Sequence, residues 1–177
     1  MKARLKFVNP DNSQFFPTLR KRVNHYFKDN NISRYGNREM FTKTIVLLGV
    51  YLACYLIILS LPLSPWLLLP FVVLMGIAKS GVGMSVMHDA LHGSYSQNPT
   101  VNKWMGNTIY MLGANAFVWK IQHNVLHHTY TNIHGMDEDI GTKVVIRLSD
   151  QTPLKPFHRY QHIYVFFLYG LMTLKML

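Results

Sequence analysis

Apolar and polar positions are sorted along this chain into long blocks. The stretch TIVLLGVYLACYLIILSL, residues 44–61, contains no charged side chain. As an α-helix its 18 residues would extend about 27 Å, which is close to the thickness of the hydrocarbon core of a bilayer. We therefore predict a first transmembrane helix at 44–61.

A second apolar run follows the turn PLSP and extends over 66–87, interrupted by Lys79. Either this lysine extends its side chain to the membrane surface, or the helix leaves the hydrocarbon near Lys79 and continues into the cytosol. We favour the second interpretation. The run therefore predicts a transmembrane helix at 66–87 that forms a hairpin with the first. Small residues that would allow close helix packing recur along it: Gly76, Ser80, Gly81, Gly83 and Ser85.

A third apolar stretch, 104–119, has 16 residues and includes Asn107 and Asn115, so it is too short and too polar to cross a bilayer. Tryptophans at both of its ends are typical of anchors at the membrane surface. We expect an interfacial helix at 104–119 and a cytosolic segment at 120–162. The last apolar stretch, 163–177, is expected to be a truncated third transmembrane helix.

The net charge of +10 is distributed unevenly, because ten of the 18 lysines and arginines precede Ile45, together with three acidic residues. A basic segment beside an apolar span is typical of the cytoplasmic side, so we expect 1–43 in the cytosol or at the membrane surface. No DNA- or RNA-binding motif accompanies the charge, and no nucleic-acid partner is expected.

Within this basic segment, apolar positions recur at helical spacing opposite three cations: Leu19, Val23 and Tyr26 or Phe27 against Arg20, Lys21 and Arg22. This pattern predicts a helix that either rests on lipid headgroups or is solvated on all sides. No apolar core lies close to Met1, so we expect no cleaved signal peptide. The single Cys54 excludes a disulfide framework. The expected fold class is an all-α integral membrane protein.

Histidines are concentrated in two polar stretches beside the apolar segments. In MHDALHGSYS, His88 and His92 are four positions apart, so on a helix both can reach one metal ion. QHNVLHHTYTN repeats this spacing at His123 and His127 and adds His128, about 100° further around an α-helix. Five imidazoles within 41 residues exceed the needs of one ion, and we predict a two-metal site.

Imidazole binds zinc, copper, iron and nickel, so the ligands alone leave the metal open. A membrane zinc hydrolase is one alternative, but Asp89 stands where HExxH has its glutamate and would reach a metal-bound water poorly. A non-catalytic histidine-rich membrane protein that binds or transports metal ions is another, although transport requires ligands inside the hydrocarbon. Four polar residues could orient the ligand rings or cap helix ends: Asp89, Asn132, Asp137 and Asp139.

The segments HDALHGSYS and WKIQHNVLHHTYTNIHGMDEDI resemble the first two histidine boxes of the membrane fatty acid desaturases. They are most similar to the bacterial front-end branch, described as linoleoyl-CoA or delta-6-type acyl-lipid desaturases. The resemblance implies a di-iron oxidoreductase that uses molecular oxygen and two electrons to introduce a double bond into an acyl-CoA or acyl-lipid. By match, the iron ligands would be His88 and His92 in box one, and His123, His127 and His128 in box two.

The sequence also departs from the family pattern. The third box, QxxHH, is absent, and Gln161–His162 within RYQHIY does not fit it. We therefore expect a fragment, the N-terminal half of a desaturase domain, that alone binds iron weakly and is inactive. No HPGG heme motif occurs, so electrons would come from a separate ferredoxin or cytochrome b5. The expected location is the bacterial inner membrane, with the N-terminus and histidine boxes cytosolic. His25, His134 and His158 lack partners at ligand spacing and are expected on the surface or beside the ligands.

Overall fold

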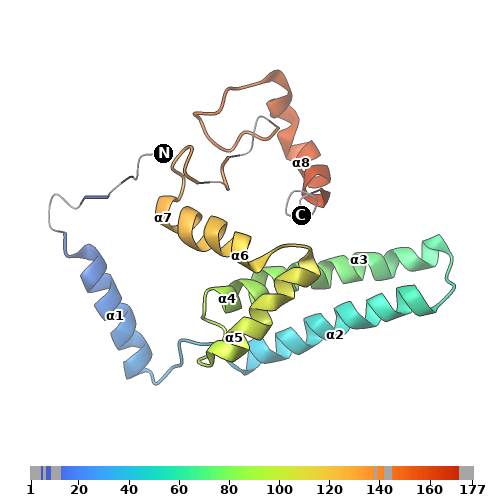
Figure 1. Ribbon diagram of the computed structural model, residues 1–177, viewed down its shortest axis with the longest axis horizontal. Helices are drawn as coiled ribbons and strands as arrows, with labels where there is room; N and C mark the ends of the chain where they lie inside the picture. The colour runs from blue at the N-terminus through green and yellow to red at the C-terminus, as the bar shows by residue number, and fades with distance from the viewer. Residues whose placement is uncertain (1–4, 6, 9–12, 138, 142–144, 172–177) are drawn as a thin grey trace. The chain divides into compact units, whose positions relative to one another are not determined.

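The computed structural model describes residues 5, 7–8, 13–137, 139–141 and 145–171 (Figure 1). Within these ranges every regular element is helical, which confirms the predicted all-α class. The chain divides into two compact units, Met1–Arg34 and Tyr35–Leu177, and each is described separately below.

The first unit contains one helix, α1 (Phe15–Asp29), at the position where helical periodicity was predicted. The hydroxyl of Ser13 accepts a hydrogen bond from the backbone N–H of Phe15 at 3.2 Å and so satisfies one of the N–H groups that a helix start leaves unpaired. Two residues beyond the helix, Asn31 takes a left-handed backbone conformation with φ of 51°, which asparagine tolerates better than most residues. No residue of α1 is buried.

The second unit begins with the long helix α2 (Arg38–Ser60), which starts six residues before the predicted 44–61. Asn37 caps it, because its Oδ1 accepts a hydrogen bond from the backbone N–H of Met40 at 3.0 Å. Glu39 in the first turn also suits the positive end of the helix dipole. The polar first turn therefore belongs to the same helix as the apolar run.

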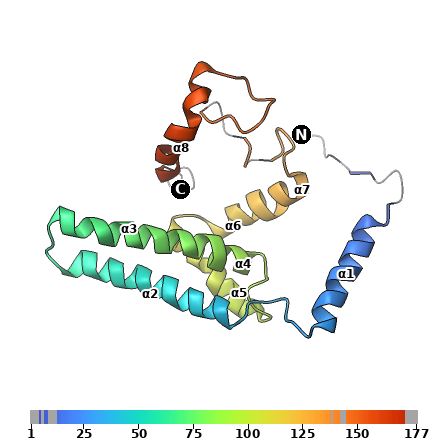
Figure 2. The same ribbon diagram turned by 180° about the vertical axis from the view of Figure 1, so that it is seen from behind.

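The next helix is longer than the predicted 66–87. It begins as α3 (Pro65–Gly81), with proline at its first position, and continues through a π-helical stretch, η1 (Val82–Met87), into α4 (His88–Leu91). The helix passes through Lys79 without a break. Helices α2 and α3 lie side by side and antiparallel, as the predicted hairpin requires (Figures 1 and 2).

Only some of the small residues on this helix face a neighbour. A Cβ added to Gly81 would lie 2.8 Å from Cδ2 of Leu47 on α2, and one added to Gly83 would lie 3.0 Å from Cδ1 of Leu112. Around Gly76, in contrast, nothing lies within 4 Å. The small residues at 81 and 83 therefore allow close packing, whereas Gly76 faces open space.

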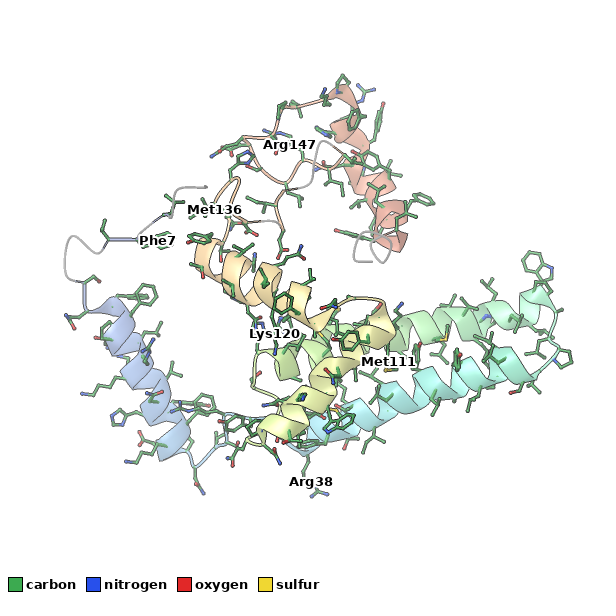
Figure 3. The ribbon with its side chains drawn as sticks, in the orientation of Figure 1. Phe7, Arg38, Met111, Lys120, Met136 and Arg147 are labelled. Carbon is green, nitrogen blue, oxygen red and sulfur yellow. The ribbon has the colours of Figure 1, made fainter. Side chains whose placement is uncertain are left out.

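In the part of the chain that the structure describes, two helices are long and apolar enough to cross a membrane, Arg38–Ser60 and Pro65–Leu91. Only 11% of the most apolar window of each is buried within the structure. A core helix of a water-soluble protein would be mostly buried, whereas here apolar side chains project outward along the hairpin (Figure 3). This exposure fits contact with lipid.

The stretch predicted as a single helix at 104–119 is divided in the structure. Helix α5 (Pro99–Gly106) continues as a 3₁₀ turn, η2 (Asn107–Leu112), and the chain then breaks at Gly113, whose φ is 79°. Helix α6 (Ala116–Trp119) restarts after Asn115, whose Oδ1 accepts hydrogen bonds from the N–H groups of Phe117 and Val118. A left-handed glycine followed by a capping asparagine explains the difference. The placement of this stretch at the membrane surface stays a prediction.

A small buried core fixes the end of the second long helix. It consists of Met40, Val82, Val86, Ala90 and Tyr95. Tyr95 is 2% exposed, and its hydroxyl donates a hydrogen bond to Oγ1 of Thr44 at 2.8 Å. Its carbonyl oxygen accepts a hydrogen bond from the N–H of Gly36 at 3.1 Å. The start of α2 is thereby joined to the loop that follows α4.

After α6, the chain forms a second π-helical stretch, η3 (Lys120–His127), and the short α7 (His128–Tyr130). Farther along, the 3₁₀ turn η4 (Pro156–Tyr160) leads into α8 (Gln161–Gly170). Helix α8 carries the first half of the apolar stretch predicted as a truncated span at 163–177, and 172–177 lie outside the described residues.

Candidate metal centre

The first histidine pair lies at the end of the helix that begins at Pro65. His88 is the first residue of α4, and His92 immediately follows its last. Their ring centroids are 4.5 Å apart, as expected for two side chains one helical turn apart on the same face.

The second histidine group has a geometry that an α-helix would not give. Positions five apart on an α-helix point about 140° away from each other. The ring centroids of His123 and His128 are nevertheless 4.8 Å apart, compared with 5.2 Å for His123 and His127. In a π-helix the hydrogen bonds join residues five apart, which brings such positions into line. His128 therefore points to the same site as the other two rings, rather than a further 100° around the helix.

The two histidine groups meet in space. The ring centroid of His92 lies 5.3 Å from that of His123 and 4.9 Å from that of His128. A hydrogen bond also joins the two segments, because the side-chain amide of Asn124 donates to the carbonyl oxygen of Leu91 at 3.1 Å. All five histidines predicted as ligands thus lie in one cluster.

Two sets of three potential ligands can be drawn from this cluster, and in each set the donor atoms lie within 4.8 Å of one another. The first set is His88, His92 and His123, and the second is His123, His127 and Asp139. Asp139 was predicted to orient a ligand, but its position also allows it to bind a metal directly. His123 is the member common to both sets.

His123 also provides a test of whether this cluster fits a metal. Its Nε2 is buried and has no hydrogen-bond partner among the residues that the structure describes. A buried polar atom without a partner costs free energy, and coordination to a metal ion would provide the missing partner. The donor set, neutral imidazoles with one carboxylate, is suited to iron among other transition metals.

Asp137 holds one of the rings in place from a buried position. The residue is 2% exposed, and each of its carboxylate oxygens lies 3.1 Å from Nδ1 of His127. It also accepts hydrogen bonds from the backbone N–H groups of Asn132 at 2.8 Å and Asp139 at 3.0 Å. Burial by itself would raise the pKa of Asp137, but these hydrogen bonds outweigh burial and lower the pKa. An ionised carboxylate here holds the ring of His127 in a fixed orientation.

The other polar residues predicted to orient the ligands behave differently from one another. Oδ1 of Asp89 lies 3.2 Å from Nδ1 of His88, and Oδ2 of Asp139 lies 3.2 Å from Nδ1 of His127. Asn132 bonds to Asp137 through its backbone N–H, from a left-handed conformation with φ of 63°. Because Asp89 is engaged with a ring, its position gives no support to a hydrolase in which it acts as general base.

The electrostatics of the cluster favour the neutral form of two rings, those of His92 and His123. Burial lowers the pKa of His92, and the neighbouring rings of His88, His128 and His123 lower it further. Burial likewise lowers the pKa of His123, with contributions from the other histidines, while Asp139 acts in the opposite direction. A histidine binds a metal ion through its neutral imidazole, not through the protonated imidazolium. The lowered pKa values therefore favour the form that can coordinate a metal.

Sequence reasoning assigned Trp119 only an anchoring role at the membrane surface. In the structure its ring centroid lies 4.5 Å from that of His123, 5.6 Å from that of His92 and 5.8 Å from that of His88. Trp119 therefore forms one wall of the cluster. Its position four residues before His123, on the same helical face, was the signal that could have revealed this role.

A pocket of about 670 Å³ adjoins the cluster, and His92 forms part of its lining together with Asn102, Lys103, Asn107 and Lys120. No acidic residue lies among the described residues that line it. The pocket therefore offers cationic and polar groups directly beside a potential metal ligand.

Of the histidines not predicted as ligands, His158 is buried, contrary to one of the two expectations for it. It is 5% exposed, and its Nδ1 accepts a hydrogen bond from the backbone N–H of Lys155 at 3.1 Å. This bond caps η4, which gives the residue a structural role.

Comparison with known proteins gives the site its context. Residues 64–177 match the fatty acid desaturase family. The chain is 36% identical to an acyl-lipid (8-3)-desaturase of Physcomitrium patens, over 98% of this chain and 37% of that protein. It is 37% identical to an sn-1 linoleoyl-lipid 6-desaturase of Arthrospira platensis, over 88% of this chain and 42% of that protein.

The chain thus spans about two fifths of the length of these relatives. No solved structure matches it. The family match covers more than half of the chain, includes both histidine groups and agrees with the resemblance carried by HDALH and HNVLHH. This protein therefore belongs to the fatty acid desaturase family.

Proposed function

We propose that this chain forms part of a membrane desaturase that introduces a double bond into the acyl chain of a lipid, with two iron ions and molecular oxygen. One observation carries the proposal: five imidazoles from two separate segments gather in one cluster, where Nε2 of His123 is buried without a partner in the described part of the chain. The names of the relatives support the reaction, since both are lipid desaturases.

In this proposal His88 and His92 help to hold one iron, while His127 and Asp139 contribute to the second, with His128 as a further donor. His123 belongs to both sets, and because a neutral imidazole has one nitrogen free to coordinate, it would bind one of the two irons. Bound iron supplies the oxidising power for removing hydrogen from an unactivated C–H bond, which no side chain can provide. The protein holds the ligands in position. Asp89 and Asp137 orient two rings, and Trp119 covers one side of the cluster and limits the access of water.

The substrate class follows from the relatives and the pocket. We favour an acyl-lipid, because both relatives are named for lipid-linked substrates. The pocket beside His92, with Lys103 and Lys120 in its lining, suits an anionic headgroup. Acyl-CoA carries the same kind of charge and remains the alternative substrate.

The electron source and the membrane orientation belong to the same proposal. Electrons would arrive from a separate acidic carrier, a ferredoxin or a cytochrome b5, attracted by the basic surface. The cations that precede Ile45, ten of the 18 in the chain, favour a cytosolic N-terminus in the bacterial inner membrane. Because the second span returns the chain to the side on which the first began, the histidines would also be cytosolic.

Anaerobic titration with Fe(II) tests the metal-binding part of this proposal. The 177-residue chain, purified in detergent, is expected to bind iron weakly, and His123→Ala should abolish that binding. His25→Ala, which changes a histidine of the first unit, should leave it unchanged. Equal iron binding by all three proteins would contradict the proposed centre.

A chimera tests the reaction. Residues 1–177 would replace the matched segment of the Arthrospira platensis relative, and the fatty acids of the expressing cells would be analysed by gas chromatography and mass spectrometry. We expect new double bonds from the chimera, first in intact lipids rather than in acyl-CoA, and none from its His92→Ala variant. The intact relative serves as the positive control. A chimera that accumulates in the membrane and binds iron, yet forms no double bond, would refute the proposed reaction.

A further inference from the structure

The apolar side chains of α1 lie along one side of the helix. At 100° per residue, the six apolar positions fall within an arc of about 120°. These positions are Phe15, Phe16, Leu19, Val23, Tyr26 and Phe27. Five of them are exposed within the first unit, from 44% at Val23 to 75% at Phe16. The helix thus presents a continuous apolar face that the described residues of its own unit leave largely uncovered.

The cations of α1 lie outside this arc, and two of them border it. On the same helical projection, Arg20 follows one edge of the apolar face and Arg22 the other, while Lys21 and Lys28 lie on the opposite side. The only acidic residue of the helix, Asp29, lies 3.9 Å from Nδ1 of His25. None of the four cations forms an ion pair within the described residues.

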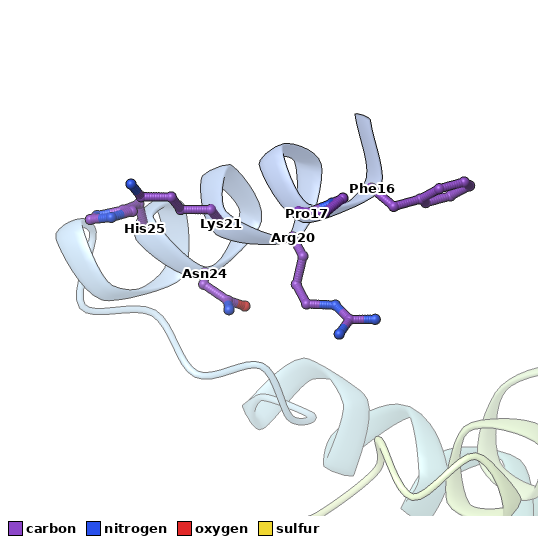
Figure 4. Close-up of a pocket in the computed structure, with 6 residues that line it drawn as sticks. All are labelled: Phe16, Pro17, Arg20, Lys21, Asn24 and His25. Carbon is purple, nitrogen blue, oxygen red and sulfur yellow. The ribbon is translucent and has the colours of Figure 1, made fainter. Parts of the chain in front are cut away.

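The border between the two faces can be seen in a close-up of α1. Arg20 and Asn24 project from the same side of the helix, and the guanidinium of Arg20 extends beneath Phe16 (Figure 4). Together with Pro17, Lys21 and His25 these residues line an open hollow along the helix. An anionic group in this hollow would contact a cation and an aromatic side chain at once.

The helix also has few of the features that stabilise a solitary helix in water. It has 15 residues, a length at which isolated helices are marginal in water. Its first turn contains no acidic residue, and none of its side chains is buried. A surface that accepts the apolar face would therefore contribute much of the free energy of helix formation.

We propose that α1 binds an anionic phospholipid surface. The apolar face would enter the boundary between headgroups and acyl chains, and Arg20 and Arg22 would contact lipid phosphates on either side of it. The long stems of both arginines can lie along the apolar region while their charged ends reach the phosphates. Four cations against one carboxylate disfavour the alternative of two α1 helices packed against each other.

A lipid surface is also the partner closest at hand. Only eight residues, 30–37, separate the end of α1 from the start of α2, which is one of the two candidate spans. An extended segment of this length covers at most about 29 Å. This proposal does not depend on the proposed metal centre, and each can be tested separately.

Site-specific fluorescence on the full chain tests the proposal. The only cysteine is Cys54, so a Cys54→Ala background allows a polarity-sensitive dye to be attached at Val23→Cys, in the middle of the apolar face. The labelled protein is reconstituted into vesicles of phosphatidylcholine, with or without phosphatidylglycerol. The matched control carries the dye at His25→Cys, about 160° around the helix from position 23.

We expect the emission at position 23 to shift to shorter wavelengths when phosphatidylglycerol is present, and the emission at position 25 to remain that of a dye in water. Each of Arg20→Gln and Arg22→Gln should lower the partition of α1 onto the anionic surface about fivefold, and added salt should act in the same direction.

Three results would overturn the proposal. An equal shift in neutral vesicles would mean that anionic lipid is not the partner. A dye at position 23 that is already shielded in detergent would mean that another part of the protein covers this face. The absence of any shift in either kind of vesicle would mean that α1 stays in water.

Discussion

His123 and His128 are five positions apart in the chain, yet their rings are closer than those of His123 and His127, at 4.8 Å against 5.2 Å between centroids. The π-helical turn of η3 produces this arrangement, because it lines up positions that an α-helix would separate. The second histidine group therefore offers three rings to one cluster, and His123 takes part in both sets of potential ligands.

The shared position of His123 predicts unequal effects of two substitutions. His123→Ala removes a donor from both ligand sets, whereas His127→Ala removes one only from the second. We expect iron binding to be lost in the first variant and about half of it to remain in the second, measured as iron per chain by mass spectrometry after anaerobic loading. The same iron content in both variants would argue against the central position of His123 among the ligands.

Asp137 should affect both stability and metal affinity. Asp137→Ala leaves two backbone N–H groups without their acceptor and leaves the ring of His127 with the exposed Asp139 alone, which should cost about 1–3 kcal/mol in the free energy of unfolding. Iron affinity should fall roughly 10- to 100-fold, as is typical when a partner of a metal ligand is removed. Thermal unfolding and Fe(II) titration in detergent measure the two effects.

The exposed Asp150 provides the matched control for this substitution, because among the described residues its carboxylate has only a 3.5 Å contact with Ser149. Asp150→Ala should change neither quantity. If the two aspartate variants behaved alike, the buried carboxylate would not have the orienting role assigned to it.

The hydrogen bond between Tyr95 and Thr44 should appear as a coupling in a double-mutant cycle. Tyr95→Phe and Thr44→Val each remove one partner of a buried bond of 2.8 Å. We expect a coupling free energy of about 0.5–1.5 kcal/mol from the unfolding of the two single variants and the double variant. Thr44→Ser, which keeps the hydroxyl, should preserve the coupling, and strictly additive effects would rule it out.

Two glycines should respond in opposite ways to alanine. A Cβ at Gly36 would lie 2.8 Å from the backbone carbonyl oxygen of Tyr95, an atom that cannot move aside easily, so Gly36→Ala should destabilise the fold by about 1–3 kcal/mol. Gly76 lies inside α3 with nothing within 4 Å, and Gly76→Ala should stabilise the helix by up to about 1 kcal/mol. Melting temperatures of the two variants in one detergent provide the comparison. An increase for Gly36→Ala would show that the packing at Gly36 is loose, and a decrease for Gly76→Ala would contradict the open space found around Gly76.

Most of the correct predictions about the long helices and the histidine cluster came from the apolar runs and the histidine spacing. Two uninterrupted runs identify two long helices, because an apolar segment of that length has few other uses. The start of α2 was missed because Arg38 and Glu39 look like loop residues, and only the capping bond of Asn37 places them in the helix. The break at Gly113 depends on a left-handed φ that glycine permits without requiring it.

The residues of the candidate site could be predicted from the sequence, whereas their arrangement in space could not. All five histidines could be named from their spacing, but the π-helical turn that brings His128 to the cluster leaves no simple periodicity. Tyr95 and Trp119 are aromatic residues in segments that could as well be exposed. Their roles depend on contacts with residues far away in the chain, Thr44 for one and His88 for the other, and such contacts are a property of the fold.

The continuous helix from Pro65 to Leu91 limits the insertions and deletions that can occur between Pro65 and the first histidine pair. His88 lies 23 residues after Pro65, which at the α-helical rise corresponds to at most about 35 Å, so the length of this helix determines how far His88 lies from Pro65. One inserted residue would raise His88 by about 1.5 Å but also swing it by about 100° away from the rings of the second group. Only insertions or deletions of nearly a whole turn, about 5.4 Å each, keep His88 pointing toward the second group. The distance of the histidines from Pro65 along the helix can therefore change only in discrete steps.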